Sequence, residues 1–152
     1  MLADSTLSRE EHHSHLQRMA FVASELARAG AAVIASTVAP HATGREAVRE
    51  MITHQAGSGG NFFLIHVATP IEHCEKTDRR GVYARARKGI IKGFIGVDEA
   101  FEPPKDANLV VDITRQTIPE IVHSTWSLTS PLKTPFLPFI GIVLLIETSG
   151  LL

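Results

Sequence analysis

Cysteine is nearly absent from this sequence: Cys74 is the only one in 152 residues, so no internal disulfide can form. A chain without disulfides suits a reducing compartment, and we expect the protein in the cytoplasm. Long apolar runs are also missing, because the stretch 136–146 is shorter than the roughly 18 to 20 residues of a membrane span and contains Pro138. The first residues, MLADSTLSREEHH, lack the basic start and apolar run of a secretory signal. The sequence therefore predicts no membrane partner.

A charge excess of either sign is missing as well. Fifteen Lys and Arg against 16 Asp and Glu give a net charge of −1 at pH 7. Such a domain is a poor nucleic-acid binder as a whole, whereas a local basic segment can hold a small anion. Hydrophobic residues make up 44% and charged residues 20%, which is ordinary for a folded globular domain. We therefore expect one domain, no nucleic-acid partner and a small anionic ligand.

The motifs of common nucleotide and metal sites are missing or incomplete. No G-x-x-x-x-G-K-[ST] loop is present, and the glycine cluster at 57–60 precedes a predicted strand, which indicates a flexible connection. His12, His13 and His15 suggest a metal by their helical spacing, but no further ligand is near them in sequence. A solvated helix start is the better interpretation, and we expect no metal site. For Cys74 we expect a buried structural thiol.

Hydrophobic periodicity predicts alternating helices and strands. A capping box formed by Ser8 and Glu11 opens a helix that ends at Gly30. The run 31–36 (AAVIAS) has no polar alternation and is typical of a strand buried on both faces. This alternation predicts an α/β fold with a parallel sheet. The remaining predicted elements are a helix over 45–54 and strands over 62–67 and 109–113.

The C-terminal region carries a segment that does not fit this alternation. A helix is expected to begin within 117–124, but prolines interrupt 125–141, and a proline inside a helix costs about 3 kcal/mol. The apolar residues on either side, within 118–122 and 142–146, fall on one helical stripe when the segment is removed. We interpret 125–141 as an insertion foreign to the fold, such as a retained intron, between two halves of one helix. A genuine surface loop is the alternative.

The segment from Arg79 to Phe94, RRGVYARARKGIIKGF, has six positive charges and no acid. Charges interleaved with small residues and bounded by glycines suit a mobile lid over an anion. An aromatic ring directly after Gly93 suits stacking on a base while cations hold phosphates. From the residues alone, an anion-binding lid and a plain surface helix both stay open. The candidate lid residues are Arg79, Arg80, Gly81, Tyr83, Arg85 and Arg87.

A long run of the sequence resembles one enzyme family. HVATPIEHCEKTDRRGVYARARKGIIKGFIGVDEAFEPP is similar to the adenylyl-sulfate (APS) kinases, whose pattern is close to TPLE-CE-D-KG-Y-KAR-GEIKGFTG-DDPYE-P. A narrower group is closer in other segments: RMAFVASELARAGAAVIAS, IVHS and IVLLIETSGLL resemble the APS-kinase-like C-terminal domain of fungal ATP sulfurylases. The similarity covers nearly the whole chain from Leu7 onward and is interrupted at 125–141, which the family lacks.

The resemblance implies a P-loop kinase-type fold, with a parallel sheet between helices. It also implies transfer of phosphate from ATP to the 3′-hydroxyl of APS, giving PAPS, with ATP and Mg²⁺ as the family's cofactors. Residues 79–88 match the family's lid. Lys92, Gly93 and Phe94 match residues that hold APS or PAPS, the phenylalanine by stacking on the adenine. Arg18 matches a basic residue in a helix that contacts APS.

The sequence departs from the family in ways that affect function. The family's first strand, its GLSGAGKST loop and its DGD segment have no counterpart here, so we expect no catalytic residue and a sheet without its centre. Leu7 replaces the second aromatic of the adenine clamp, and His12 and His15 replace an arginine and an asparagine. Ile95 replaces a threonine. Arg45 lies near the family's arginine after a turn that reads A-P-H here in place of S-P-Y.

Two functions of different class follow from this resemblance for a partial APS-kinase-like domain over 7–152. The first is the PAPS-sensing C-terminal domain of a fungal ATP sulfurylase (sulfate adenylyltransferase), which binds APS, PAPS and ATP-like nucleotides without catalysis. It is then attached to the sulfurylase domain and homo-oligomeric. The alternative is a true APS kinase whose N-terminal P-loop exon is missing. A non-functional fragment of a gene is a third possibility.

Overall fold

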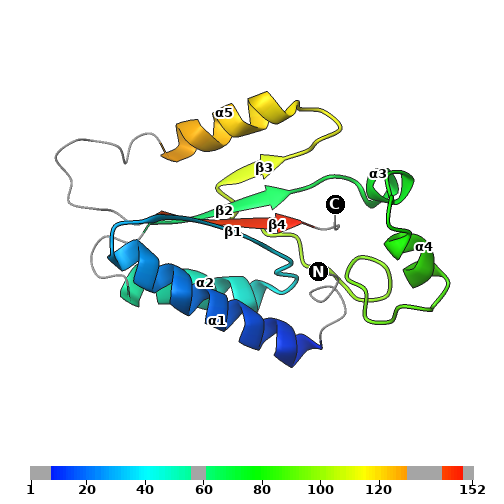
Figure 1. The fold of residues 1–152 in the computed structure, drawn as a ribbon, viewed down its shortest axis with the longest axis horizontal. Helices are drawn as coiled ribbons and strands as arrows, with labels where there is room; N and C mark the ends of the chain where they lie inside the picture. Colours follow the sequence, from blue (N-terminus) through cyan, green and yellow to red (C-terminus); the bar gives the residue numbers. More distant parts are fainter. Residues whose placement is uncertain (1–7, 56–60, 130–141, 149–152) are drawn as a thin grey trace.

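The computed structural model describes residues 8–55, 61–129 and 142–148. Helices and strands alternate along most of the chain (Figure 1). Among the described residues, no helix combines the length and the apolar character that a membrane crossing requires. The elements in chain order are α1 (Arg9–Arg28), β1 (Ala32–Thr37), α2 (Ala42–Gln55), β2 (Asn61–Val67), α3 (Ile71–Lys76), α4 (Val82–Arg87), β3 (Leu109–Val111), α5 (Ile118–Thr129) and β4 (Ile142–Thr148).

The strands form one parallel sheet in the order β1-β4-β2-β3. Helices α1 and α2 lie on one side of this sheet, and α5 lies on the other side, next to β3 (Figure 1). The prediction of an α/β fold with a parallel sheet between helices is confirmed. Strand β4 lies between β1 and β2 and pairs with both along its length. Ile142 lies opposite Ala32 of β1, and Thr148 lies opposite Val67 of β2.

The predicted helix over the C-terminal apolar run is wrong, because residues 142–148 form the strand β4. A short apolar run fits either a helix or a strand by periodicity alone, and here partner strands on both sides satisfy its backbone hydrogen-bonding groups. The expectation of a sheet without its centre is also wrong, because β4 lies between β1 and β2. Helix α5 extends through Thr125–Thr129 and stops before Pro131. Residues 130–141 lie outside the described residues, so the insertion stays a prediction.

Helix α1 begins as the sequence predicts. The Ser8 hydroxyl accepts a hydrogen bond from the Glu11 backbone N–H at 3.3 Å, and the Glu11 carboxylate accepts one from the Ser8 N–H at 2.8 Å. These bonds satisfy two backbone donors of the first turn. The apolar stripe of α1 then packs against α2 and the sheet. The buried residues of this core include Leu16, Ala20, Ala23, Ala27, Val48, Ile52, Phe62 and Leu64.

Strand β1 is less buried than its sequence predicts. Burial on both faces was expected, but Ile34 is 68% exposed, whereas Ala35 and Thr37 are buried. The reason is its position: β1 lies at the edge of the sheet, and α1 and α2 cover one side of it. By contrast, β2 lies inside the sheet, and Leu64 and Ile65 are almost fully buried.

Candidate functional site

The candidate site lies where the parallel strands end. In Figure 1 the strand arrowheads point toward α3, α4 and the N-terminal end of α1. Ligands of open α/β sheets bind outside the carboxyl ends of the strands, because the loops and helix N-termini there supply polar groups. The basic segment predicted as a lid therefore lies at the end of the sheet where a ligand is expected.

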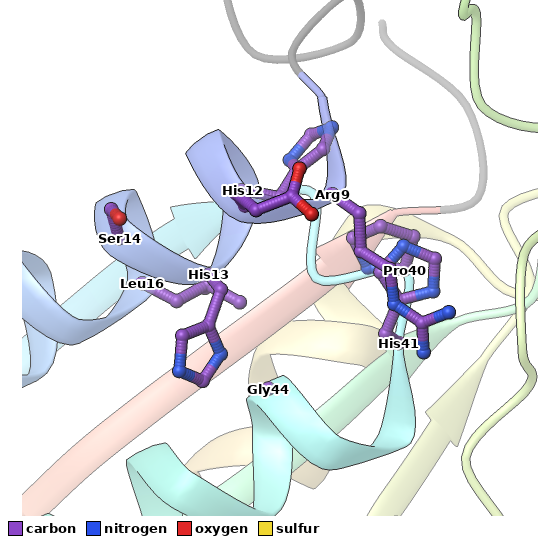
Figure 2. Close-up of a pocket in the computed structure, with 9 residues that line it drawn as sticks. Arg9, His12, His13, Ser14, Leu16, Pro40, His41 and Gly44 are labelled. Carbon is purple, nitrogen blue, oxygen red and sulfur yellow. The ribbon is translucent and has the colours of Figure 1, made fainter.

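A pocket of about 410 Å³ lies between the first turns of α1 and α2 (Figure 2). Gly44 permits this arrangement, because a Cβ at that position would come 3.0 Å from Cδ1 of Leu16. The pocket is rich in groups that can carry positive charge, with Glu10 as the acid among its lining residues. The lining residues are Arg9, Glu10, His12, His13, Ser14, Leu16, Pro40, His41 and Gly44.

The three N-terminal histidines do not share one environment. His12 is 2% exposed and faces the pocket, so a solvated position is the wrong expectation for this residue. His12, in the first turn of α1, lines the same pocket as Pro40 and His41 (Figure 2). His13 is exposed and His15 half-buried. No group of three or more metal-ligating side chains occurs in the part of the chain that the structure describes.

Glu102 joins the pocket wall to the segment that follows the basic stretch. One carboxylate oxygen accepts a hydrogen bond from the Ala42 N–H at 2.8 Å, and the other lies 3.4 Å from Nδ1 of His41. The Glu102 N–H donates to the Pro40 carbonyl at 2.9 Å. The Ala42 N–H is the largest cause of a lowered pKa of Glu102, and His41 and Arg9 lower that pKa further. Glu102 is therefore held as a carboxylate at the start of α2.

The buried Arg45 side chain connects two backbone segments of the protein. Its guanidinium donates hydrogen bonds of 2.7 Å to the carbonyls of Ala39 and Glu102, and the residue is 5% exposed. Nearby, the His66 ring stacks on Phe101 with centroids 5.7 Å apart. Burial lowers the pKa of His66, and the positive charge of Arg45 lowers it further. His66 is therefore kept neutral.

The predicted lid forms the short helix α4. The Asp78 carboxylate accepts hydrogen bonds from the N–H groups of Val82 and Ala84, at 2.8 and 3.1 Å, and so fixes the start of this helix. Gly81 precedes it with φ of 63°, a conformation that glycine adopts without strain. Arg87 forms an ion pair with Glu75 at 2.7 Å, and Arg85 Nε donates to the Gly81 carbonyl. The exposed cations of the segment are Arg79, Arg80, Arg85, Arg87, Lys88 and Lys92.

Phe94 lies inside the protein, where it is 1% exposed. Its ring meets Tyr83 edge-on, and both belong to a cluster with Cys74, Val82 and Ala86. The turn that follows is fixed by Asp98, which accepts hydrogen bonds from the N–H groups of Gly93 and Phe94 at 2.8 and 2.6 Å. The predicted stack of this ring on an adenine stays a prediction, and it requires the turn to move. Burial raises the pKa of the Cys74 thiol, and the expected buried structural thiol is what the structure contains.

The structure brings only some of the predicted residues together. Lys92, Gly93 and the lid arginines belong to one continuous segment, whereas Arg18 is exposed on α1 and lines a separate groove beside β1. Sequence reasoning missed His41 and Glu102 as parts of the site. Their pairing joins residues about sixty positions apart, and no local pattern marks it.

A parallel sheet between helices, with a pocket lined by Arg9 and three histidines and a basic segment at its carboxyl end, is the architecture of open α/β domains that bind their ligands at the strand ends. The sequence profile described as adenylylsulphate kinase matches residues 1–112. The chain belongs to the adenylylsulphate kinase family. The fold is similar to the crystal structure of APE1195, with a TM-score of 0.71 and 34% sequence identity. The match covers 82% of this chain and 68% of that chain.

Curated relatives carry the name sulfate adenylyltransferase. The protein from Neosartorya fischeri is 52% identical over 143 residues, which is 94% of this chain and 21% of that protein. The Aspergillus terreus protein is 57% identical over 116 residues, and the Mycosarcoma maydis protein is 58% identical over 117 residues. These alignments cover 76% and 77% of this chain and 20% of each relative. The chain thus spans about a fifth of the length of these relatives.

The residues present do not fit ATP with Mg²⁺ as the family uses it. A phosphate cradle needs consecutive backbone N–H groups, a lysine and a metal-binding hydroxyl in a G-x-x-x-x-G-K-[ST] loop, which the 152 residues lack. Within the described ranges, no cluster of carboxylates supplies a site for the metal instead. The 152 residues therefore combine a pocket lined by Arg9 and histidines with a basic segment, and they do not include the loop that holds the phosphates of ATP in this family.

Proposed function

We propose that this chain is a nucleotide-sensing domain of a sulfate adenylyltransferase, which binds APS or PAPS without phosphorylating it. The observation that carries the proposal is the pocket of Arg9, His12, His13 and His41 in a chain that contains no phosphate-binding loop. Guanidinium groups and imidazole N–H groups are donors that suit the phosphate and sulfate oxygens of such a ligand. The names of the relatives support the assignment to that protein.

The ligand contacts divide between the pocket and the basic segment. The pocket holds the anionic end of the nucleotide, with His41 oriented by Glu102. The exposed cations of the segment, Lys92 among them, close over its remaining charges. Phe94 reaches the adenine once the turn held by Asp98 opens. Among the residues that the resemblance assigns to APS binding, Arg18 lies apart from the basic segment, because it lines the groove beside β1.

In this function the domain is attached to a sulfurylase domain in a homo-oligomeric cytoplasmic protein. A true APS kinase, with its phosphate-binding loop encoded outside these residues, is the alternative. The pocket and the basic segment belong to both proposed functions, so ligand binding does not distinguish the sensing domain from the kinase. Catalysis distinguishes them, because phosphoryl transfer depends on the phosphate-binding loop.

Calorimetric titration of the purified chain with APS, PAPS and ATP tests the proposal. We expect APS or PAPS to bind at least tenfold more tightly than ATP, and His41→Ala to weaken that binding about tenfold. His123→Ala, on an exposed position of α5, is the matched control and leaves binding unchanged. A coupled assay on the same sample is expected to show no PAPS formation from ATP and APS. PAPS formation by the chain, or equal affinity for all three nucleotides, contradicts the proposal.

A further inference from the structure

A second cavity, of about 800 Å³, lies between α2 and the segment 101–106, which follows the basic stretch. We call it the α2 cavity. It is larger than the pocket of about 410 Å³ at the start of α1, and among the described residues the two linings have none in common. Cavities of about 300 to 1,000 Å³ are typical of small-molecule sites. The proposed function leaves this cavity without a role.

The walls of the α2 cavity are held by contacts within the protein. The Arg45 guanidinium donates a hydrogen bond of 2.7 Å to the Glu102 carbonyl, which holds one wall against the first turn of α2. One turn further along α2, Arg49 donates a hydrogen bond of 2.7 Å to the Asp106 carboxylate. A ligand that enters walls of this kind has to order little of the protein, which favours binding.

The ring of Phe101 gives the α2 cavity an apolar wall. It is half-buried and stacks on His66, with centroids 5.7 Å apart and ring planes 13° from parallel. This contact holds the ring in one orientation, and Pro103 adds further apolar surface beside it. An apolar or aromatic group of a ligand is therefore expected to pack on Phe101.

The described lining of the α2 cavity carries positive and negative groups in equal number. These residues are Arg45, Arg49, Lys105, Glu46, Glu102 and Asp106. The acids oppose a polyphosphate, and the bases oppose a metal cation. Glu46 and Lys105 are exposed and accessible to a ligand, whereas the other four form the contacts already described. One accessible acid and one accessible base suit a small molecule that carries one charge of each sign.

We infer that the α2 cavity binds a free α-amino acid with a large apolar side chain. The ammonium group of the ligand pairs with Glu46, its carboxylate pairs with Lys105, and its side chain packs on Phe101. The inference concerns a cavity outside the nucleotide pocket, and it does not depend on the proposed function.

Calorimetric titration of the full 152-residue chain with L-phenylalanine tests the inference. We expect binding that weakens at least tenfold in Glu46→Gln and in Lys105→Gln. The matched controls are Glu50→Gln, one turn further along α2, and Lys76→Gln, at the end of α3. Both control residues are exposed and lie outside the lining of the cavity, so these variants are expected to leave binding unchanged.

Analogues of the ligand keep the inference testable if a variant fails to fold. N-Acetyl-L-phenylalanine lacks the ammonium charge, L-phenylalaninamide lacks the carboxylate, and glycine lacks the apolar side chain. We expect each of them to bind the unmodified chain at least tenfold more weakly than L-phenylalanine. Absence of phenylalanine binding overturns the inference, as does equal binding of phenylalanine and its N-acetyl derivative. Unchanged affinity in both Glu46→Gln and Lys105→Gln overturns it as well.

Discussion

The carboxylate of Glu102 lies 3.4 Å from Nδ1 of His41 and accepts a hydrogen bond from the Ala42 N–H at 2.8 Å, which connects the segment after the basic stretch to the first turn of α2. Because these contacts lower the pKa of Glu102, its stabilising effect is present above the ordinary glutamate pKa and is lost as pH falls through the lowered pKa. We expect Glu102→Gln to reduce the free energy of unfolding at pH 7 and to change it little near pH 3. Urea unfolding at both pH values measures this difference. Glu46→Gln, on an exposed position of α2, is the control, and an equal loss at both pH values contradicts stabilisation by the ionised carboxylate of Glu102.

The buried ring of Phe94 is expected to contribute strongly to stability. Its removal in Phe94→Ala leaves a cavity beside Tyr83 and Cys74, and such truncations cost about 3 to 5 kcal/mol. Phe94→Leu keeps most of the volume, and we expect it to cost less than half as much. Thermal or urea unfolding measures both variants. If Phe94→Ala leaves stability unchanged while it weakens binding of APS, the ring acts on the ligand and not in the core.

The free energy of unfolding is expected to depend on pH through the buried His66. Burial and Arg45 lower its pKa, so the stability that this residue contributes is present above the ordinary histidine pKa of about 6.5 and is lost as pH falls through the lowered pKa. We expect His66→Phe, which retains stacking on Phe101, to flatten the decrease in stability as the pH falls below about 6.5. The midpoint of thermal unfolding across this range is the measurement. His123→Phe is the control, and an unchanged pH profile in His66→Phe excludes this role for His66.

The position of β4 predicts a specific cross-link. Ala35 and Leu145 are direct partners across the β1–β4 pair, so cysteines at both positions are close enough to oxidise to a disulfide. In a Cys74→Ala background, we expect rapid cross-linking of Ala35→Cys with Leu145→Cys. The pair Ala35→Cys with Val143→Cys, which is two residues out of register, is expected to remain reduced. Mobility on non-reducing gels reads out both pairs. A helical 142–148 segment predicts no preference for the in-register pair.

Local signals in the sequence were sufficient to predict several elements correctly. The Ser8–Glu11 capping box starts α1, and Leu64 lies in a run of apolar residues that forms β2. The glycines around the basic segment also mark real turns, since Gly81, Gly89 and Gly93 all have positive φ. These features depend on neighbouring residues, and the sequence around each of them contains what determines it.

Features that depend on distant residues could not be predicted in the same way. Whether Ile34 is buried depends on what covers the edge of the sheet, and the run AVIAST gives no sign of that. The pairing of Glu102 with Ala42 joins segments that no sequence spacing relates. The apolar run of β4 fits a helical stripe as well as a strand, and its partners β1 and β2 decide between the two.

The threading of β4 has a consequence for biosynthesis. Of the four strands that the structure describes, β4, which separates β1 from β2, is translated last, and its pairing of Ala32 with Ile142 spans most of the sequence. At about 5 to 20 residues per second, a ribosome finishes the other three strands several seconds before it delivers β4. During that interval the edges of β1 and β2 that β4 later joins lack their partner strand. A pause in translation just before β4 would lengthen this exposure and favour aggregation over closure of the sheet.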